Sequence, residues 1–141
     1  MFDNVFTVAS FIISLVALIF SIFGFWQSRV SAVRDFFSQG DTVEMKTYRK
    51  VIYDIYNHNT DLVDILENLK IQSVEVSHVI SFYDFWALMV KKHYLPEWTF
   101  QASSKYTAVN IYNKVKPYVE FRRIEQPDYA NHFEWLVNRL K

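Results

Sequence analysis

The sequence contains no cysteine, only two glycines and only three prolines among its 141 residues. The absence of cysteine excludes disulfides and a thiolate nucleophile, and it agrees with a reducing compartment. The two glycines, Gly24 and Gly40, cannot form a glycine-rich phosphate loop, and no serine lies in a nucleophile-elbow motif. Because helix-breaking residues are so rare, the chain is expected to form long helices.

Charge is missing from one long segment. Val5 to Trp26 are 22 consecutive residues without a charged side chain, and fourteen of them are Val, Ile, Leu or Phe. As a helix this segment would reach roughly 33 Å, enough to cross a hydrocarbon core of about 30 Å. A cleaved signal peptide would need a basic start and a small-residue cleavage site, and a buried core helix is rarely apolar on every face in so small a protein. The segment therefore predicts a transmembrane helix over residues 5–26.

The flanking charges predict how this helix is oriented. Asp3 is the only charged side chain before it, whereas Arg29 and Arg34 follow it. Because Lys and Arg remain preferentially on the cytoplasmic side, residues 1–4 are expected outside and the rest of the chain in the cytosol. We expect a bacterial inner (cytoplasmic) membrane location, with the lipid bilayer contacted at its inner interface by Phe25, Trp26, Arg29 and Arg34.

Small residues recur along the apolar segment with alternating spacings of three and four. This pattern places them on one side of a helix, as in a heptad repeat. Inside a membrane, close backbone approach and interhelical hydrogen bonds drive association, and both favour small residues. The pattern predicts self-association as a dimer or small bundle through a seam formed by Thr7, Ser10, Ser14, Ala17, Ser21, Gly24, Ser28 and Ser31.

The remaining chain predicts an all-α fold. Residues 27–40 should extend the first helix, with a stripe of Trp26, Val30, Val33 and Phe37 packing against a cytosolic bundle of four or five helices over residues 41–141. A particularly broad apolar surface predicts that the helix beginning near Ser73 lies at the centre of the bundle. The expected helix N-caps are Asp41, Ser73, either Ser103 or Ser104, and Asp128.

No pattern in the sequence indicates a complete catalytic or metal site. Glu75 and His78 have the spacing of half a di-iron motif, and Asp128 and His132 that of half a zinc site, but neither has the further ligands it would need. We therefore assign no catalytic residue, metal or cofactor. The cytosolic part has a net charge of only about +1, so nucleic acid is not expected as a partner. A basic face of Lys114, Lys116, Arg122 and Arg123 is a further alternative, which together with Arg29 and Arg34 would contact anionic lipid headgroups.

Four segments carry a resemblance to a known family. They are Phe36 to Asp41, Phe85 to Pro96, Lys116 to Arg123 and Tyr129 to Glu134. Together they resemble a family of small bacterial and phage-encoded proteins known only as a domain of unknown function. The resemblance implies a hydrophobic N-terminus joined to a helical cytosolic domain, and it implies no activity.

The favoured functional hypothesis is a single-pass, membrane-anchored helical protein. It would act in interaction or regulation, in a phage-related or defence-related role, with itself and a cytosolic protein as partners. The first alternative is a small oligomeric pore lined by seam serines. The second is a ligand sensor or enzyme that uses the aromatic helical bundle, with His78 and Tyr83 as candidates.

Overall fold

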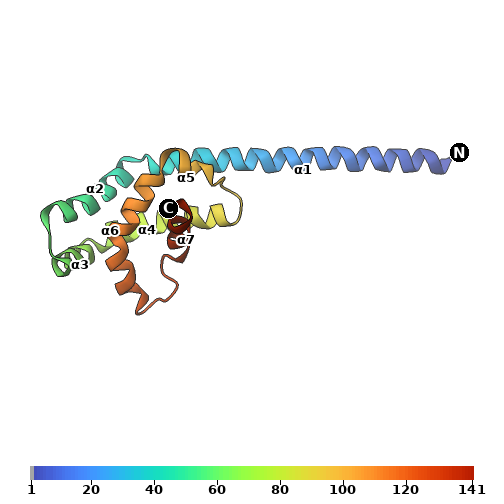
Figure 1. Ribbon diagram of the computed structural model, residues 1–141. Coiled ribbons are helices and arrows are strands. Elements are labelled where there is room, and N and C mark those ends of the chain that lie inside the picture. Colours follow the sequence, from blue (N-terminus) through green and yellow to red (C-terminus); the bar gives the residue numbers. More distant parts are fainter. Residues whose placement is uncertain (1) are drawn as a thin grey trace.

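A long helix projects from a compact group of shorter ones (Figure 1). The computed structural model describes residues 2–141, and the side chains of residues 6–101 and 104–141. Helix α1 (Phe2–Gly40) has 39 residues and a length of about 58 Å. Its most apolar stretch has a mean hydropathy of 2.6, and none of that stretch is buried. By length and composition, α1 is able to cross a membrane, as the sequence predicted.

The other elements are also helices, so the all-α prediction is confirmed over the described residues. Five of them have ten residues or more, and α5 is a single short helix between two longer ones. They are α2 (Val43–His58), α3 (Leu62–Ile71), α4 (Ser73–Lys91), α5 (Trp98–Ser103), α6 (Lys105–Arg123) and α7 (Asn131–Leu140).

Helix α4 forms the centre of the bundle, as its broad apolar surface predicted. It lies against α2, α3, α6 and α7. Its ring and branched side chains fill the space between these helices, because residues on several of its faces are apolar. The buried residues of α4 are Val76, Val79, Ile80, Tyr83, Trp86, Ala87 and Val90. Helix α7 covers it with Phe133, Leu136, Val137 and Leu140.

The contact between α1 and the bundle differs from the predicted stripe. Trp26 and Val30 are exposed, and the anchoring side chain is Phe36, which is only 3% exposed. The ring of Phe36 lies 5.5 Å from that of Trp86 and 4.7 Å from that of Phe100. Half of the stripe is confirmed, since Val33 and Phe37 pack against the core, and the other half was wrong because the bundle meets only the last turns of α1. The face that it covers is centred on Phe36, one residue away from the predicted line.

Three predicted helix caps were also wrong. Thr42 caps α2, accepting a hydrogen bond from the Met45 N–H at 3.2 Å, although Asp41 precedes it. The N-cap of α4 is Gln72, and that of α7 is Ala130 in a left-handed conformation; neither makes a side-chain cap hydrogen bond. For α7 a distant residue substitutes, because Asp84 on α4 accepts a hydrogen bond from the Phe133 N–H at 2.9 Å.

Candidate functional site

The predicted seam lies on the free part of α1. Every side chain from Thr7 to Ser28 is exposed, and Ser31, at the end of the seam, is half-buried. The Ser21 hydroxyl donates a hydrogen bond to the Ala17 carbonyl one turn earlier, at 2.9 Å. A Cβ atom added at Gly24 would meet no other atom within 4 Å. Within one chain, therefore, no steric contact requires a glycine at this position.

The seam and the bundle occupy different sides of α1. With about 100° between successive helical residues, Gly24, Ser28 and Ser31 point about 120° away from the direction of Ala32, Val33 and Phe36. The last three pack on the core, with Phe36 buried. The cytosolic end of the seam instead borders a surface hollow lined by Gly24, Gln27, Ser28, Val30, Ser31 and Arg34. A second helix is able to approach this side without displacing the bundle's own contacts.

The four residues predicted to lie at the membrane interface are all on α1, but their surroundings differ. Phe25 and Trp26 are 53% and 61% exposed, and Arg34 is also exposed. Arg29 is half-buried, and its guanidinium carbon lies 5.7 Å from the centroid of the Phe25 ring. Arg29 is thus held between the apolar rod and the bundle.

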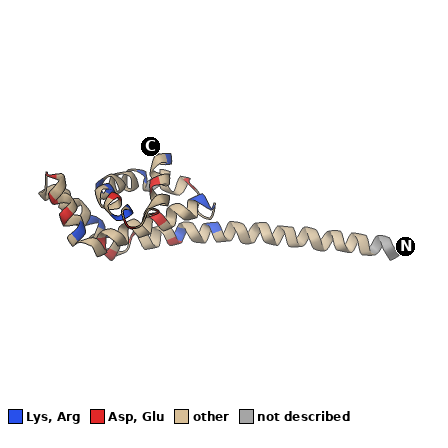
Figure 2. Cartoon of the chain, turned by 90° about the horizontal axis from the view of Figure 1, so that it is seen from below, with Lys and Arg blue, Asp and Glu red and all other residues tan. Residues whose placement is uncertain are grey.

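A basic rim beside Arg29 was missed by the sequence reasoning. Arg29 lines a pocket together with Lys91, His93, Glu97, Trp135 and Arg139, which come from the α4–α5 segment and from α7. Arg139 donates to the Glu97 carboxylate through Nε at 3.2 Å and Nη2 at 2.8 Å. Charged residues cluster on the bundle and the adjoining part of α1, and none lies along the described apolar rod (Figure 2). Only the fold brings this rim to the level of Arg29, so no local sequence pattern marked it.

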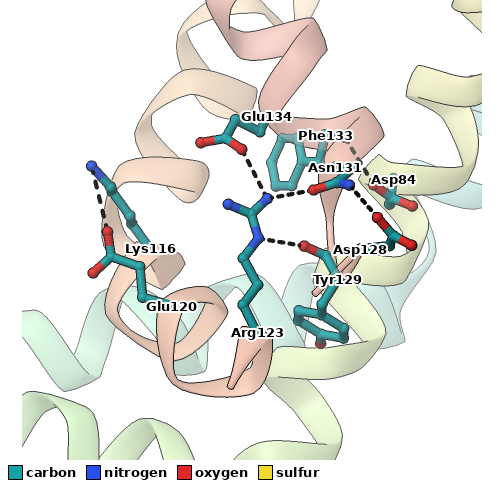
Figure 3. A network of polar contacts seen from close by, with 9 residues as sticks. All are labelled: Asp84, Lys116, Glu120, Arg123, Asp128, Tyr129, Asn131, Phe133 and Glu134. Atoms are coloured by element: carbon teal, nitrogen blue, oxygen red, sulfur yellow. Dashed lines mark hydrogen bonds and ion pairs between the residues drawn. The ribbon is translucent and has the colours of Figure 1, made fainter. Parts of the chain in front are cut away.

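A polar network joins the end of α6 to the start of α7 (Figure 3). Arg123 donates from Nε to the Tyr129 carbonyl at 2.9 Å and from Nη2 to the Asn131 side chain at 3.0 Å. The same Nη2 lies 2.8 Å from the Glu134 carboxylate. Arg123 therefore fixes the turn between the two helices, and these contacts give its positive charge a structural role.

The network shifts two nearby pKa values. The hydrogen bond from the Arg123 guanidinium lowers the pKa of Glu134, against a smaller opposing effect of burial. Burial raises the pKa of Tyr112, and the neighbouring Glu134 carboxylate raises it further. Both shifts follow from packing between α6 and α7.

The residues considered for ligand sensing or metal binding lie apart. The Tyr83 ring is only 1% exposed and stacks on Phe133 with 4.8 Å between centroids. His78 lies on the surface, edge-on to the Tyr48 ring at 5.2 Å. Among the residues that the structure describes, no three His, Asp or Glu side chains converge closely enough to hold a metal ion. The two side chains proposed for a sensor thus point to different surroundings.

The basic residues considered for lipid contact are divided among separate surroundings. Lys114 lies over the Tyr56 ring, Lys116 is paired with Glu120 at 3.7 Å, and Arg123 belongs to the network above. Arg122 lies over the Tyr129 ring instead. These four side chains of α6 therefore have different neighbours.

The comparison with known families agrees with this architecture. A family described as a domain of unknown function (DUF4760) matches residues 11–140, from within the apolar part of α1 to the last residue of α7. The chain belongs to this family, as the resemblance implied. No curated protein and no solved structure matches the chain.

Proposed function

We propose that this protein is a single-pass membrane protein that self-associates through the seam and presents the helical bundle to protein partners in the cytosol. The location would be a bacterial inner membrane, with the N-terminus outside. The bundle would act as an interaction or regulatory module. Some of its polar groups fix helices to one another, as in the Arg123 network.

The exposed apolar side chains of α1 carry this proposal. Fourteen large hydrophobic residues between Phe6 and Trp26 are each 45–73% exposed. Full burial of such a side chain contributes about 1.5–3 kcal/mol, so counting half of each gives about 10–20 kcal/mol. The stability of a whole domain is only about 5–15 kcal/mol. A surface of this size needs an apolar environment, and the rod has the length to find one in a bilayer.

The charge distribution supports the orientation. Arg29 and Arg34 lie in the last third of α1, at the end that carries the bundle. The rim containing Lys91 and Arg139 lies beside Arg29. Positive charge is retained on the cytoplasmic side during insertion. The absence of native cysteine allows a direct test with two single-cysteine variants, Asn4→Cys and Asn57→Cys. In intact cells, a membrane-impermeant maleimide should label the first and spare the second; the reverse pattern would refute the orientation.

Self-association is tested by filling the seam. Replacing Ser14, Ala17 and Ser21 by Leu should reduce the mass of the intact complex in detergent, because bulk prevents close backbone approach. Gly24→Leu should do the same, and since nothing in the single chain lies within 4 Å of an added Cβ, its effect would report an intermolecular contact.

A matched control uses the opposite face of the rod. Replacing Ile12, Ile19 and Phe23 by Leu keeps that face apolar and should leave the mass of the complex unchanged. If the seam variants also retain the wild-type mass, the seam is not the interface. Steady conductance of reconstituted bilayers would indicate the pore instead.

A further inference from the structure

Two rows of polar side chains face each other across a groove between α4 and α6. Ser73, Ser77 and Ser81 are spaced by four residues on α4, so they lie along one face of that helix. Tyr118 and Arg122 have the same spacing on α6. With Val74 and His78 they line an open groove of about 470 Å³.

The groove is lined by hydrogen-bond donors and contains no carboxylate. Hydroxyl groups, an imidazole and a guanidinium make up its polar lining. The Ser77 and Tyr118 hydroxyls lie 3.1 Å apart at its base, and the Tyr129 hydroxyl donates to Ser77 at 3.4 Å. These contacts hold the two rows in position. The lining therefore suits an anion.

Arg122 supplies an uncompensated positive charge beside these hydroxyls. Its guanidinium carbon lies 5.5 Å from the centroid of the Tyr129 ring. Its Nε is buried and has no hydrogen-bond partner within the described part of the chain. The neighbouring Arg123, in contrast, is bound to Tyr129, Asn131 and Glu134. No ion pair or side-chain hydrogen bond of Arg122 is found within the described residues, so the part of its guanidinium that lines the groove is available to an anion.

The N-terminal end of α4 adds to the positive electrostatic potential in the groove. Ser73 is the first residue of this 19-residue helix, and the helix has no side-chain cap. The N-terminal end of a helix carries a partial positive charge and free N–H groups that favour anions. The groove thus combines a helix terminus, three serine hydroxyls and a guanidinium from another helix.

We propose that this groove binds a soluble molecule carrying a phosphate monoester. A phosphate group presents several strong acceptor oxygens, which matches donors that approach from two helices, and a guanidinium binds it in a bidentate manner. The position favours a soluble ligand over a lipid headgroup. The C-terminal end of α4 lies at the level of Arg29, whereas Ser73 is about 27 Å further along the helix, away from the apolar rod.

The test measures binding to the full-length protein in detergent micelles by calorimetric titration at constant ionic strength. The probes are inorganic phosphate and glycerol 3-phosphate, with sodium chloride as the reference. We expect saturable binding of glycerol 3-phosphate that Arg122→Gln weakens by roughly 10- to 100-fold, the range for losing a charged hydrogen bond. Lys116→Gln removes one charge from the same helix outside the groove and should leave binding unchanged.

A second variant separates loss of binding from loss of structure. Ser81 is exposed, so Ser81→Leu should retain the wild-type unfolding temperature while blocking the groove. Absence of saturable binding, or equal weakening by Arg122→Gln and Lys116→Gln, would refute the site. Binding to vesicles containing phosphatidic acid but not to glycerol 3-phosphate would refute the soluble ligand. The mass of the intact complex, measured in parallel, reports the seam independently of this groove.

Discussion

Removing the Phe36 ring should weaken the packing of α1 against the bundle and lower the free energy of unfolding. This ring is 3% exposed and lies within 6 Å of the rings of Phe37, Phe82, Trp86 and Phe100, at 5.2, 5.8, 5.5 and 4.7 Å between centroids. Replacing a buried phenylalanine by alanine costs about 3–5 kcal/mol, through lost transfer free energy and the cavity that remains. Phe36→Ala should therefore remove a large part of the stability of a domain of this size.

The measurement is urea unfolding of the full-length protein in a mild detergent, followed by tryptophan fluorescence. Trp86 makes this signal sensitive to the junction, because its ring is an edge-on neighbour of Phe36. Val30→Ala is the control. Val30 is 50% exposed, so its truncation should change the free energy of unfolding by less than about 0.5 kcal/mol. A loss below about 1 kcal/mol for Phe36→Ala, or equal losses for both variants, would contradict the described junction.

Three further predictions concern the contacts between α4, α6 and α7. Asp84→Ala should destabilise the bundle by about 1 kcal/mol, since it removes the acceptor for the Phe133 N–H at the start of α7, and thermal unfolding measures this. Because the folded pKa of Glu134 is lowered, its stabilising contribution is complete above the ordinary value of 4.5 and is lost as pH falls through the folded pKa. Arg123→Gln should flatten this acid dependence of unfolding; an unchanged profile would contradict the pairing. The raised pKa of Tyr112 predicts that stability decreases as pH rises above 10.0, where the unfolded phenol ionises first, and Tyr112→Phe should reduce that decrease in denaturation at alkaline pH.

The long rod and the central helix were predictable because their signals are local. An uncharged run of 22 residues and an apolar surface on several faces of one helix are properties of consecutive residues. The buried residues of α7 recur at helical spacing, which is likewise a property of consecutive residues; they are Phe133, Leu136, Val137 and Leu140.

The predictions that were wrong depended on partners distant in the sequence. Asp128 has the chemistry of an N-cap, but α7 begins after Ala130 and takes its acceptor from Asp84, which is 49 residues from Phe133. The outer part of the stripe, Trp26 and Val30, was chosen by spacing alone. Which residues of α1 become buried depends on where Phe82, Trp86 and Phe100 are placed by other helices.

The sequence by itself determined that the chain is helical, that its N-terminal rod carries no charge on any side, and that small residues line one side of it. Periodicity and composition alone set these features. The tertiary structure decided that Phe36 joins the rod to the bundle, that a basic rim lies beside Arg29, and that Arg122 faces three serines of α4. These arrangements arise from packing between residues far apart in the chain, which no local pattern records.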